Sequence, residues 1–367
     1  MPGTASTKPA RKGRTGRKAL LCTLGPSSLN REVIPDLEAA GVTSFRINMS
    51  HTSLADLDRV IRFIQECTQV PICIDTEGAQ IRTGVMAQPT TLARGSPVRL
   101  VPESAPGGPT TIPLTPSSVI QALSPGSVMS IDFDSVVLQV DAVTPDLAEA
   151  TVVTGGDVGT HKAVTVLPSP SLPTFSPKDL KAVEIGLEHR IREYALSFCE
   201  GPEAVQRLRE LVGDGSRIIA KIESREGVRN LAPIAEHADA LLIDRGDLSR
   251  EVRIEVIPLL QKAIIRKANA LGVPVYVATN LLESMGTRRT PTRAEVNDVI
   301  NTLLDGADGL VLAAETAIGK FPVEAARMIA ALMNEYEGSI DGYRIEDLLG
   351  NHPLSAVHGS AEGRQGS

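Results

Sequence analysis

Short runs of apolar, often β-branched residues alternate along much of this chain with longer segments whose apolar positions recur at helical spacing. The predicted strands cover 19–25, 42–50, 70–76, 193–199, 217–224, 240–246, 274–280 and 309–315. Helices separate most of them, and a Thr-x-x-Glu capping box at Thr292 and Glu295 starts one of these. Eight strands in this alternation predict an α/β fold, a (β/α)8 TIM barrel. An open doubly wound sheet is the alternative, but the sequence contains no Gly-x-Gly-x-x-Gly loop for a dinucleotide.

The helical period disappears between about Gly84 and Pro170. Val- and Thr-rich runs lie there between turns rich in Pro and Gly, at 96–102, 135–140 and 163–168. We therefore predict an all-β domain over 84–170, inserted into a barrel formed by 18–83 and 171–340.

The bulk composition narrows the possible partners. The net charge of −7 argues against a nucleic-acid partner for the folded body. No apolar run reaches transmembrane length, and no apolar stretch follows the basic N-terminus as in a secretory signal. The four cysteines lack metal-ligand spacing and are interpreted as reduced thiols. We expect a cytoplasmic protein without membrane contact, with a disordered basic arm at 1–17 and a loose tail at 341–367.

Polar and charged residues gather at the C-terminal ends of the predicted strands, where a barrel carries its chemistry. Lys221 and Glu223 share one face of their strand, and Asp247 follows the next strand. The two carboxylates offer hard oxygens to Mg²⁺ or Mn²⁺, so substrate and water would have to complete the coordination. Nearby cationic side chains, those of Lys221, Arg46 and Arg82, suit a phosphate or a developing enolate. Rim salt bridges could explain one such strand, but seven strand ends together favour a site for a metal and a small phosphorylated or keto acid.

Several of these strings resemble the pyruvate kinase family. The resemblance spans roughly Lys18 to Met333, and its motifs include CTLGPSS (22–28), RINMSH (46–51), DTEGAQIRTG (75–84), KIESREGV (221–228), RGDL (245–248), TPTRAEVNDV (290–299) and ETAIGKFPVEA (315–325). It implies a barrel with a mobile lid formed by the insertion. It also implies a homodimer or homotetramer, with the helix after Thr292 and Arg293 packed on a neighbouring barrel.

The resemblance also implies a role for each matching residue. Lys221 would stabilise charge on the transferring phosphoryl group and the enolate, and Thr279 would lie beside the methylene carbon that is protonated. The implied catalytic residues are Lys221, Thr279, Arg46 and Arg82. The implied substrate-binding residues are Arg46, Lys221, Arg245, Gly246, Asp247 and Thr279. The implied nucleotide-binding residues are His51, Arg82 and Lys162. The implied divalent-metal ligands are Glu223 and Asp247, and the implied monovalent-cation ligands are Asn48, Ser50, Asp75 and Thr76.

The chain departs from the family pattern mainly on the nucleotide and proton-relay sides. Ala79 and Gln80 replace a proline and a charged residue, which leaves potassium use open. Ala313 replaces a serine, and Ile318 stands where a lysine often lies near the nucleotide phosphates. Phe133 interrupts an Asp-Asp-Gly turn of the insertion, and the loop after Asp247 begins with Ser249 and Arg250. The sequence stops after the last barrel helix, so we expect no C-terminal regulatory domain.

Three functions remain open at this point. The first is a phosphotransferase that binds phosphoenolpyruvate or pyruvate through Mg²⁺ and passes the phosphoryl group to ADP by way of a metal-stabilised enolate, with weak or altered nucleotide use. The second is a metal-dependent lyase, aldolase or decarboxylase that acts on a pyruvate-like keto acid. The third is a non-catalytic binder or sensor of phosphoenolpyruvate, which the intact Lys221, Glu223, Asp247 and Thr279 argue against.

Overall fold

The computed structural model describes residues 18–339 and Gly342, apart from residues 79, 105, 133, 169 and 171. The predicted arm at 1–17, the predicted tail except Gly342, and the departures at Ala79 and Phe133 therefore lie outside the described residues. Within the described part of the chain, no helix is long and apolar enough to cross a membrane.

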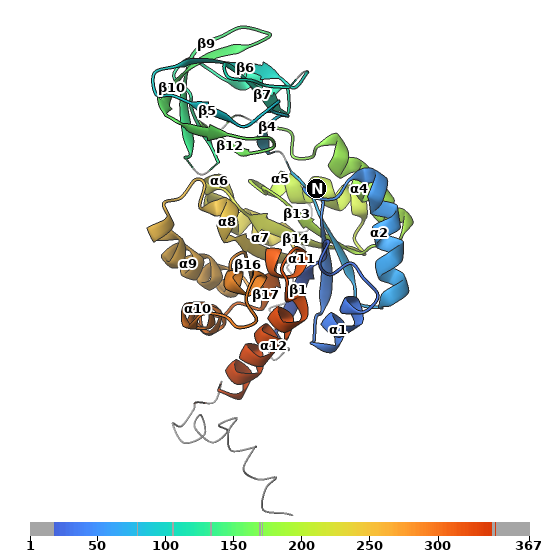
Figure 1. The fold of residues 1–367 in the computed structure, drawn as a ribbon. Helices are drawn as coiled ribbons and strands as arrows, with labels where there is room; N and C mark the ends of the chain where they lie inside the picture. The colour runs from blue at the N-terminus through green and yellow to red at the C-terminus, as the bar shows by residue number, and fades with distance from the viewer. Residues whose placement is uncertain are drawn as a thin grey trace, which may run out of the picture.

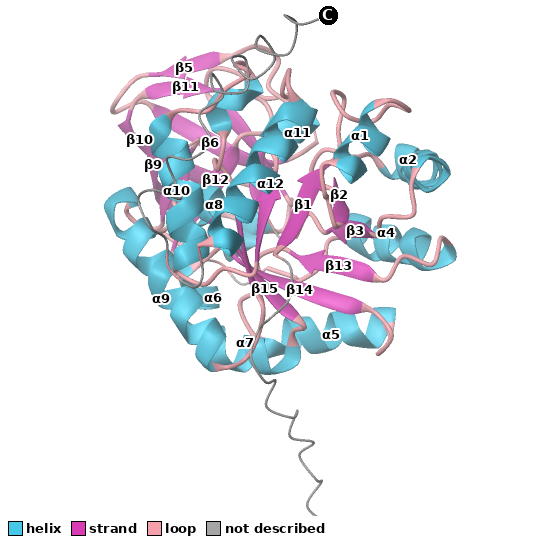
Figure 2. Ribbon diagram, turned by 90° about the horizontal axis from the view of Figure 1, so that it is seen from below, coloured by secondary structure: helices cyan, strands magenta, loops and turns pink. Residues whose placement is uncertain are grey.

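Eight parallel strands close into a barrel, which confirms the predicted fold (Figures 1 and 2). Their order around the barrel is β1, β17, β16, β15, β14, β13, β3, β2. The strands are β1 (Ala19–Thr23), β2 (Ser44–Asn48), β3 (Ile72–Asp75), β13 (Glu193–Leu196), β14 (Arg217–Ile222), β15 (Ala240–Asp244), β16 (Val275–Ala278) and β17 (Gly309–Leu312). The barrel closes where Ala19 of the first strand pairs with Gly309 of the last. Each of the eight strands lies within a predicted run but ends one to three residues before the predicted end. Strand β15, for example, ends at Asp244 because Arg245–Leu248 form a helical turn, α8.

Helices surround this barrel on the outside (Figure 2). They are α1 (Val33–Ala39), α2 (Leu54–Cys67), α4 (Pro177–Glu188), α5 (Pro202–Val212), α6 (Arg225–Arg229), α7 (Leu231–His237), α9 (Ile257–Ala270), α10 (Arg293–Leu304), α11 (Ala314–Ala317) and α12 (Pro322–Gly338), with 3-10 turns η1 (Ile254–Val256) and η2 (Glu283–Gly286). The apolar stripe of α2 packs inward, with Leu57, Ile61 and Ile64 fully buried. The predicted capping box is present, because Thr292 accepts from Glu295 N while Glu295 accepts from Thr292 N.

The inserted segment forms a second closed barrel, which we call the small barrel (81–167), and it stands over one end of the larger one (Figure 1). Its strands are β4 (Ile81–Thr83), β6 (Pro97–Pro102), β7 (Thr111–Thr115), β8 (Val128–Ile131), β9 (Val136–Val143), β10 (Ala148–Thr154) and β12 (Ala163–Leu167), with a separate pair β5 (Thr90–Leu92) and β11 (Gly156–Val158). Strand β4 begins three residues before the predicted start at 84, because Ile81 and Arg82 already pair with β12. The insertion is also not entirely β, since it contains the four-residue helix α3 (Val119–Ala122).

Candidate active site

The C-terminal ends of β3, β14, β15 and β16 bring four of the predicted residues together beneath the small barrel. Asp75 is the last residue of β3, and Lys221 lies near the end of β14. Glu223 is the first residue after β14, and Thr279 is the first residue after β16. All of them point to the same mouth because parallel strands end on the same side of a barrel. The first three are almost completely buried.

Lys221 sits among carboxylates rather than facing water. Its Nζ lies 2.9 Å from Glu223 Oε1, 3.3 Å from Asp75 Oδ1 and 3.0 Å from Ser197 Oγ. Burial alone would lower the pKa of this ammonium, but the charges of Asp75, Glu223 and Asp244 outweigh burial and raise it. Lys221 is therefore a fixed positive charge at the centre of the mouth.

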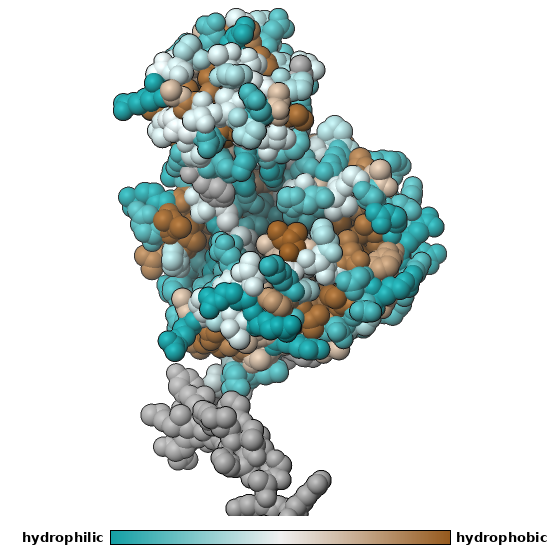
Figure 3. All heavy atoms as spheres, viewed as in Figure 1, coloured by the Kyte–Doolittle hydropathy of each residue, from teal (hydrophilic) through white to brown (hydrophobic). Residues whose placement is uncertain are grey.

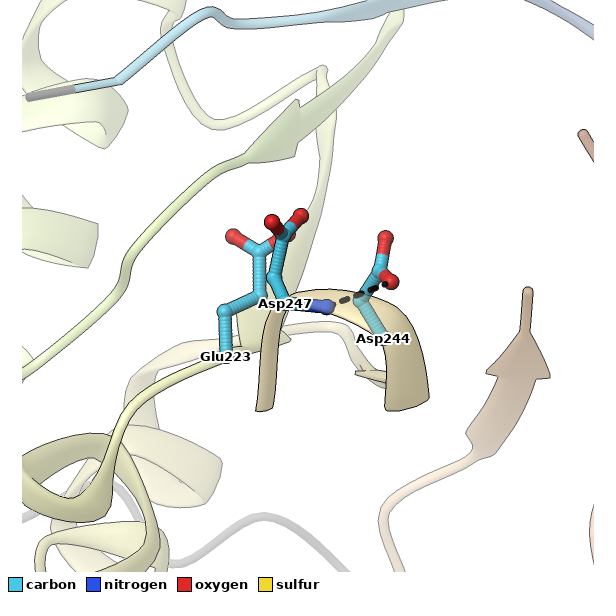
Figure 4. Close-up of side chains that lie close together, drawn as sticks. All are labelled: Glu223, Asp244 and Asp247. Carbon is cyan, nitrogen blue, oxygen red and sulfur yellow. Dashed lines mark hydrogen bonds between the residues drawn. The ribbon is translucent and has the colours of Figure 1, made fainter. Parts of the chain in front are cut away.

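Three carboxylates lie close enough to hold one cation. One oxygen each of Glu223, Asp244 and Asp247 falls within 4.8 Å of the others. In Figure 4 the carboxyl groups of Glu223 and Asp247 stand side by side, and Asp244 accepts from the backbone N–H of Asp247. Glu223 Oε2 accepts from Phe198 N at 2.6 Å, and the buried Glu223 Oε1 faces the Lys221 ammonium at 2.9 Å. Buried carboxylates this close together repel one another unless positive charge lies between them, and carboxylate oxygens are the ligands of hard cations. Glu223 and Asp247, with Asp244 beside them, therefore fit Mg²⁺ or Mn²⁺.

The pKa shifts of these carboxyl groups also favour a bound cation. Burial raises the pKa of Glu223 to about 8, against the lowering effect of Lys221. Burial and the neighbouring Asp244 also raise the pKa of Asp247. Burial would raise the pKa of Asp244 as well, but Lys221 and the Thr279 hydroxyl hold it below its usual range. Without a cation, burial and the neighbouring carboxylates therefore favour a proton on Glu223 more than on an exposed glutamate.

Arg46 and Asp75 form a buried ion pair at 2.8 Å, on neighbouring strands. Arg46 Nε also donates a hydrogen bond to Thr23 Oγ1. Asp75 therefore meets two cations, Arg46 and Lys221, and links the phosphate-binding candidate to the central lysine. Such a linked network holds its members in one arrangement.

The four monovalent-cation candidates lie at the ends of β2 and β3, where Asn48 pairs in register with Asp75. The Asn48 amide oxygen accepts from Ser50 N, and the Thr76 carbonyl accepts from Ser197 Oγ at 2.7 Å. These groups are close together, but three of them already have partners within the protein.

The nucleotide-binding candidates lie further out, at the rim. Arg82 donates to His161 O at 3.1 Å and to Gln80 Oε1 at 2.5 Å. Lys162 pairs with Asp132 at 2.7 Å within the small barrel. The exposed His51 has its pKa lowered, first by partial desolvation and then by the charges of Arg82 and Arg46.

Arg245 does not point into the acidic cluster. Its guanidinium donates twice to the carbonyl of Thr279, at 3.1 and 2.6 Å, and once to Asp298 of α10 at 2.7 Å. Its contacts are thus to the backbone of Thr279 and to a carboxylate of α10. Gly246 lies against Thr279, and a Cβ at that position would come within 2.8 Å of Thr279 Cγ2.

A cleft of about 200 Å³ separates the two barrels beside this cluster. Glu223, Asp247 and Arg250 line it from the large barrel, and Ile81 and Val164 line it from the small one. The space-filling view shows the molecule narrowing at this level, with hydrophilic residues around it (Figure 3). A small anion with a bound cation could enter from this side.

Two residues of this site escaped the sequence analysis, Asp244 and Ser197. Asp244 is the last residue of β15, and its position at a strand end directly before RGD was the available signal. Ser197 follows β13 and contacts Asp75, Thr76 and Lys221, but an uncharged serine after a strand gives no distinctive signal.

Comparison with known proteins shows extended similarity to one family. The family model described as pyruvate kinase, barrel domain, matches residues 15–326. The pyruvate kinase of Thermococcus litoralis is 34% identical over 348 residues, which cover 91% of this chain and 73% of that protein. Plastidial pyruvate kinase 3 of Arabidopsis thaliana is 33% identical, and the pyruvate kinase of Bacillus licheniformis is 35% identical. The chain covers 58% of the length of each of these two relatives.

Proposed function

Because the chain belongs to the pyruvate kinase family, we propose that it is a phosphotransferase that moves the phosphoryl group of phosphoenolpyruvate to a nucleoside diphosphate. The observation that carries this proposal is the buried Lys221 beside the Glu223, Asp244 and Asp247 carboxylates. A bare carboxylate cluster would repel an anionic substrate. With a divalent cation, a fixed ammonium and Arg46 nearby, the same mouth attracts a phosphorylated carboxylic acid.

Glu223 and Asp247 would hold the cation, which would supply positive charge to the oxygens of the substrate. The remaining steps belong to the residues of the chain. Lys221 lies where it can oppose negative charge as the P–O bond to the enol oxygen breaks. The phosphoryl group passes to an oxygen of the nucleoside diphosphate, and the enolate that remains takes a proton at its methylene carbon to give pyruvate.

The outer rim supports weak or altered nucleotide use. Ile318 is 67% exposed and brings no charge to a phosphate, and Lys162 is paired with Asp132. Nucleotide binding would therefore depend mainly on Arg82.

A coupled assay of pyruvate release from phosphoenolpyruvate tests the proposal. It would use Mg²⁺ and a panel of nucleoside diphosphates, with Lys221→Met as the matched inactive control. We expect release that needs both the metal and one of the diphosphates. No release above the control with any diphosphate would refute the phosphotransferase.

A metal-dependent enzyme that forms an enolate from a keto acid is the second candidate. One contrast favours it: the buried lysine and carboxylates of the inner mouth are intact, whereas Ile318 offers no charge at the rim. Exchange of the pyruvate methyl protons with solvent deuterium, in the absence of any nucleotide, would identify this activity.

A further inference from the structure

Three successive residues, Asp244, Arg245 and Gly246, hold Thr279 from three sides. The carboxylate of Asp244 accepts the Thr279 hydroxyl at 2.5 Å. The guanidinium of Arg245 binds the Thr279 carbonyl through two hydrogen bonds. Gly246 lies so close to the Thr279 methyl group that any side chain there would have to displace it. The hydroxyl, the carbonyl and the methyl group of one residue are thus each fixed by a different neighbour.

Thr279 needs such support because of its backbone. Its φ is +75°, and the next residue, Asn280, has φ +56°. A β-branched residue rarely adopts the left-handed region, and such conformations persist where surrounding contacts hold them. Arg245 is itself braced by Asp298 of α10. Strain at a strand end of the mouth, secured by three contacts, is typical of a functional position.

Asp244 differs from the other carboxylates in what it contacts. It lies 3.9 Å from Lys221 Nζ and has the Thr279 hydroxyl on Oδ1, so it joins the lysine to the threonine. Since the Thr279 hydroxyl donates its hydrogen bond to Asp244, the Thr279 oxygen can only accept from any other partner.

We propose that Asp244 is a positioning residue that makes the Thr279 hydroxyl a hydrogen-bond acceptor for a water molecule beside the substrate. This inference rests on the proposed function, because it assigns a role within enolate protonation. A Thr279 that already donates to Asp244 does not supply the proton. It holds a water molecule, and that water supplies the proton to the carbon.

The proton balance follows from this arrangement. An O–H bond of the held water breaks, and the electron pair of the enolate C=C bond forms the new C–H bond. The enolate oxygen becomes the keto oxygen of pyruvate. The hydroxide left behind takes a proton from bulk solvent. The reverse sequence removes a methyl proton from pyruvate, so exchange with solvent deuterium reports the step without any nucleotide.

The experiment measures deuterium entry into the methyl group of pyruvate by the full chain with Mg²⁺. The variants are Asp244→Ala, Asp244→Asn, Thr279→Val and the double variant Asp244→Ala/Thr279→Val. Asparagine keeps an oxygen that accepts from Thr279, so Asp244→Asn is the conservative rescue. Calorimetric Mn²⁺ binding is measured on every variant, which separates positioning from metal ligation.

We expect Asp244→Ala to lower the limiting exchange rate about tenfold to a hundredfold while the half-saturating pyruvate concentration changes little. Thr279→Val should have a similar effect, and the double variant should be no worse than the poorer single one. Asp244→Asn should stay within about threefold of the parent protein, because the hydrogen bond is kept. Mn²⁺ binding should be retained in all four, because Glu223 and Asp247 remain.

Additive losses in the double variant would overturn the inference, as would unchanged exchange in Asp244→Ala. Loss of Mn²⁺ binding in that variant would make Asp244 a metal ligand and overturn the positioning role. Absence of exchange in the parent protein would also overturn it. A different outcome would refute only the phosphotransferase proposal: no phosphoryl transfer with any nucleotide, while methyl exchange and its dependence on Asp244 are kept.

Discussion

The mouth of the large barrel has two parts that differ in structure: an inner half around Lys221 and Glu223, and an outer half at the rim. Lys221 and Glu223 are buried in a network of short contacts that the large barrel supplies by itself. The outer candidates, Arg82, Lys162 and His51, lie on or near the small barrel, where Arg82 donates to His161 O and Lys162 pairs with Asp132. The large barrel alone organises the inner half, whereas the outer half also uses residues of the small barrel, Arg82 and Lys162. Chemistry that uses only the inner half should therefore proceed without a nucleotide, whereas phosphoryl transfer, which uses the outer half, should not.

The largest expected effect is on the central lysine. Lys221→Met should reduce both pyruvate release and methyl exchange by about a hundredfold or more, because Lys221 is the cation that contacts both Asp75 and Glu223. Removing one partner of a buried ion pair also destabilises a protein, so melting temperatures must be compared. Lys178→Met is the matched control, since Lys178 is a half-buried lysine paired with Glu77 outside the acidic cluster. Similar losses in both variants would contradict the special role of Lys221.

The second effect concerns the metal. Glu223→Gln or Asp247→Asn should abolish Mn²⁺-dependent binding of oxalate, an enolate mimic, in calorimetry. Each substitution keeps the shape of the side chain but removes a negative oxygen donor from a site with few protein ligands. Glu251→Gln, on the same cleft, should bind oxalate normally. Unchanged metal-dependent binding in both site variants would remove the assignment.

The third effect is a pH dependence of metal binding. The pKa of Glu223 is about 8, so below that pH a proton competes with the cation. Apparent Mn²⁺ affinity should fall by up to about tenfold for each pH unit below 8 and level off above it. The sign for stability is opposite: the raised pKa means that the metal-free protein is stabilised at low pH and loses this contribution as pH rises through about 8. A pH-independent affinity between pH 6 and 8 would contradict the protonated Glu223.

The smallest expected effect concerns Ile318 at the rim. Ile318→Lys should raise ADP-dependent turnover several-fold, because a lysine there would face the nucleotide phosphates that the resemblance places nearby. Leu259→Lys, at another strongly exposed apolar position, should leave turnover unchanged. Fast, saturable ADP turnover by the parent protein would show that Ile318 and Ala313 do not limit the enzyme.

Much of the fold was predictable because alternation of strands and helices is a property of the whole pattern. The exact ends were not. The predicted strand 240–246 ran into Arg245, since the turn at Arg245–Leu248 is set by Asp244 capping α8 and by tertiary contacts of Arg245. The start of β4 was missed because pairing with β12 is a long-range contact.

The site, too, was predictable in its general position but not in its details. Charged residues at strand ends were visible in the sequence, and Lys221, Glu223 and Asp247 do come together. The third carboxylate, Asp244, and the outward turn of Arg245 depend on which way side chains leave a strand end, which periodicity does not specify. Potassium use, the homodimer or homotetramer and the cytoplasmic location stay predictions.

The measurement that tests the central claim most directly compares two rates on one preparation. One is deuterium exchange into the methyl group of pyruvate with Mg²⁺ alone, and the other is ADP-coupled pyruvate release from phosphoenolpyruvate. The organised inner mouth predicts metal-dependent exchange that Lys221→Met abolishes, at a rate above ADP-coupled turnover. Exchange no faster than in the Lys221→Met variant would contradict the account.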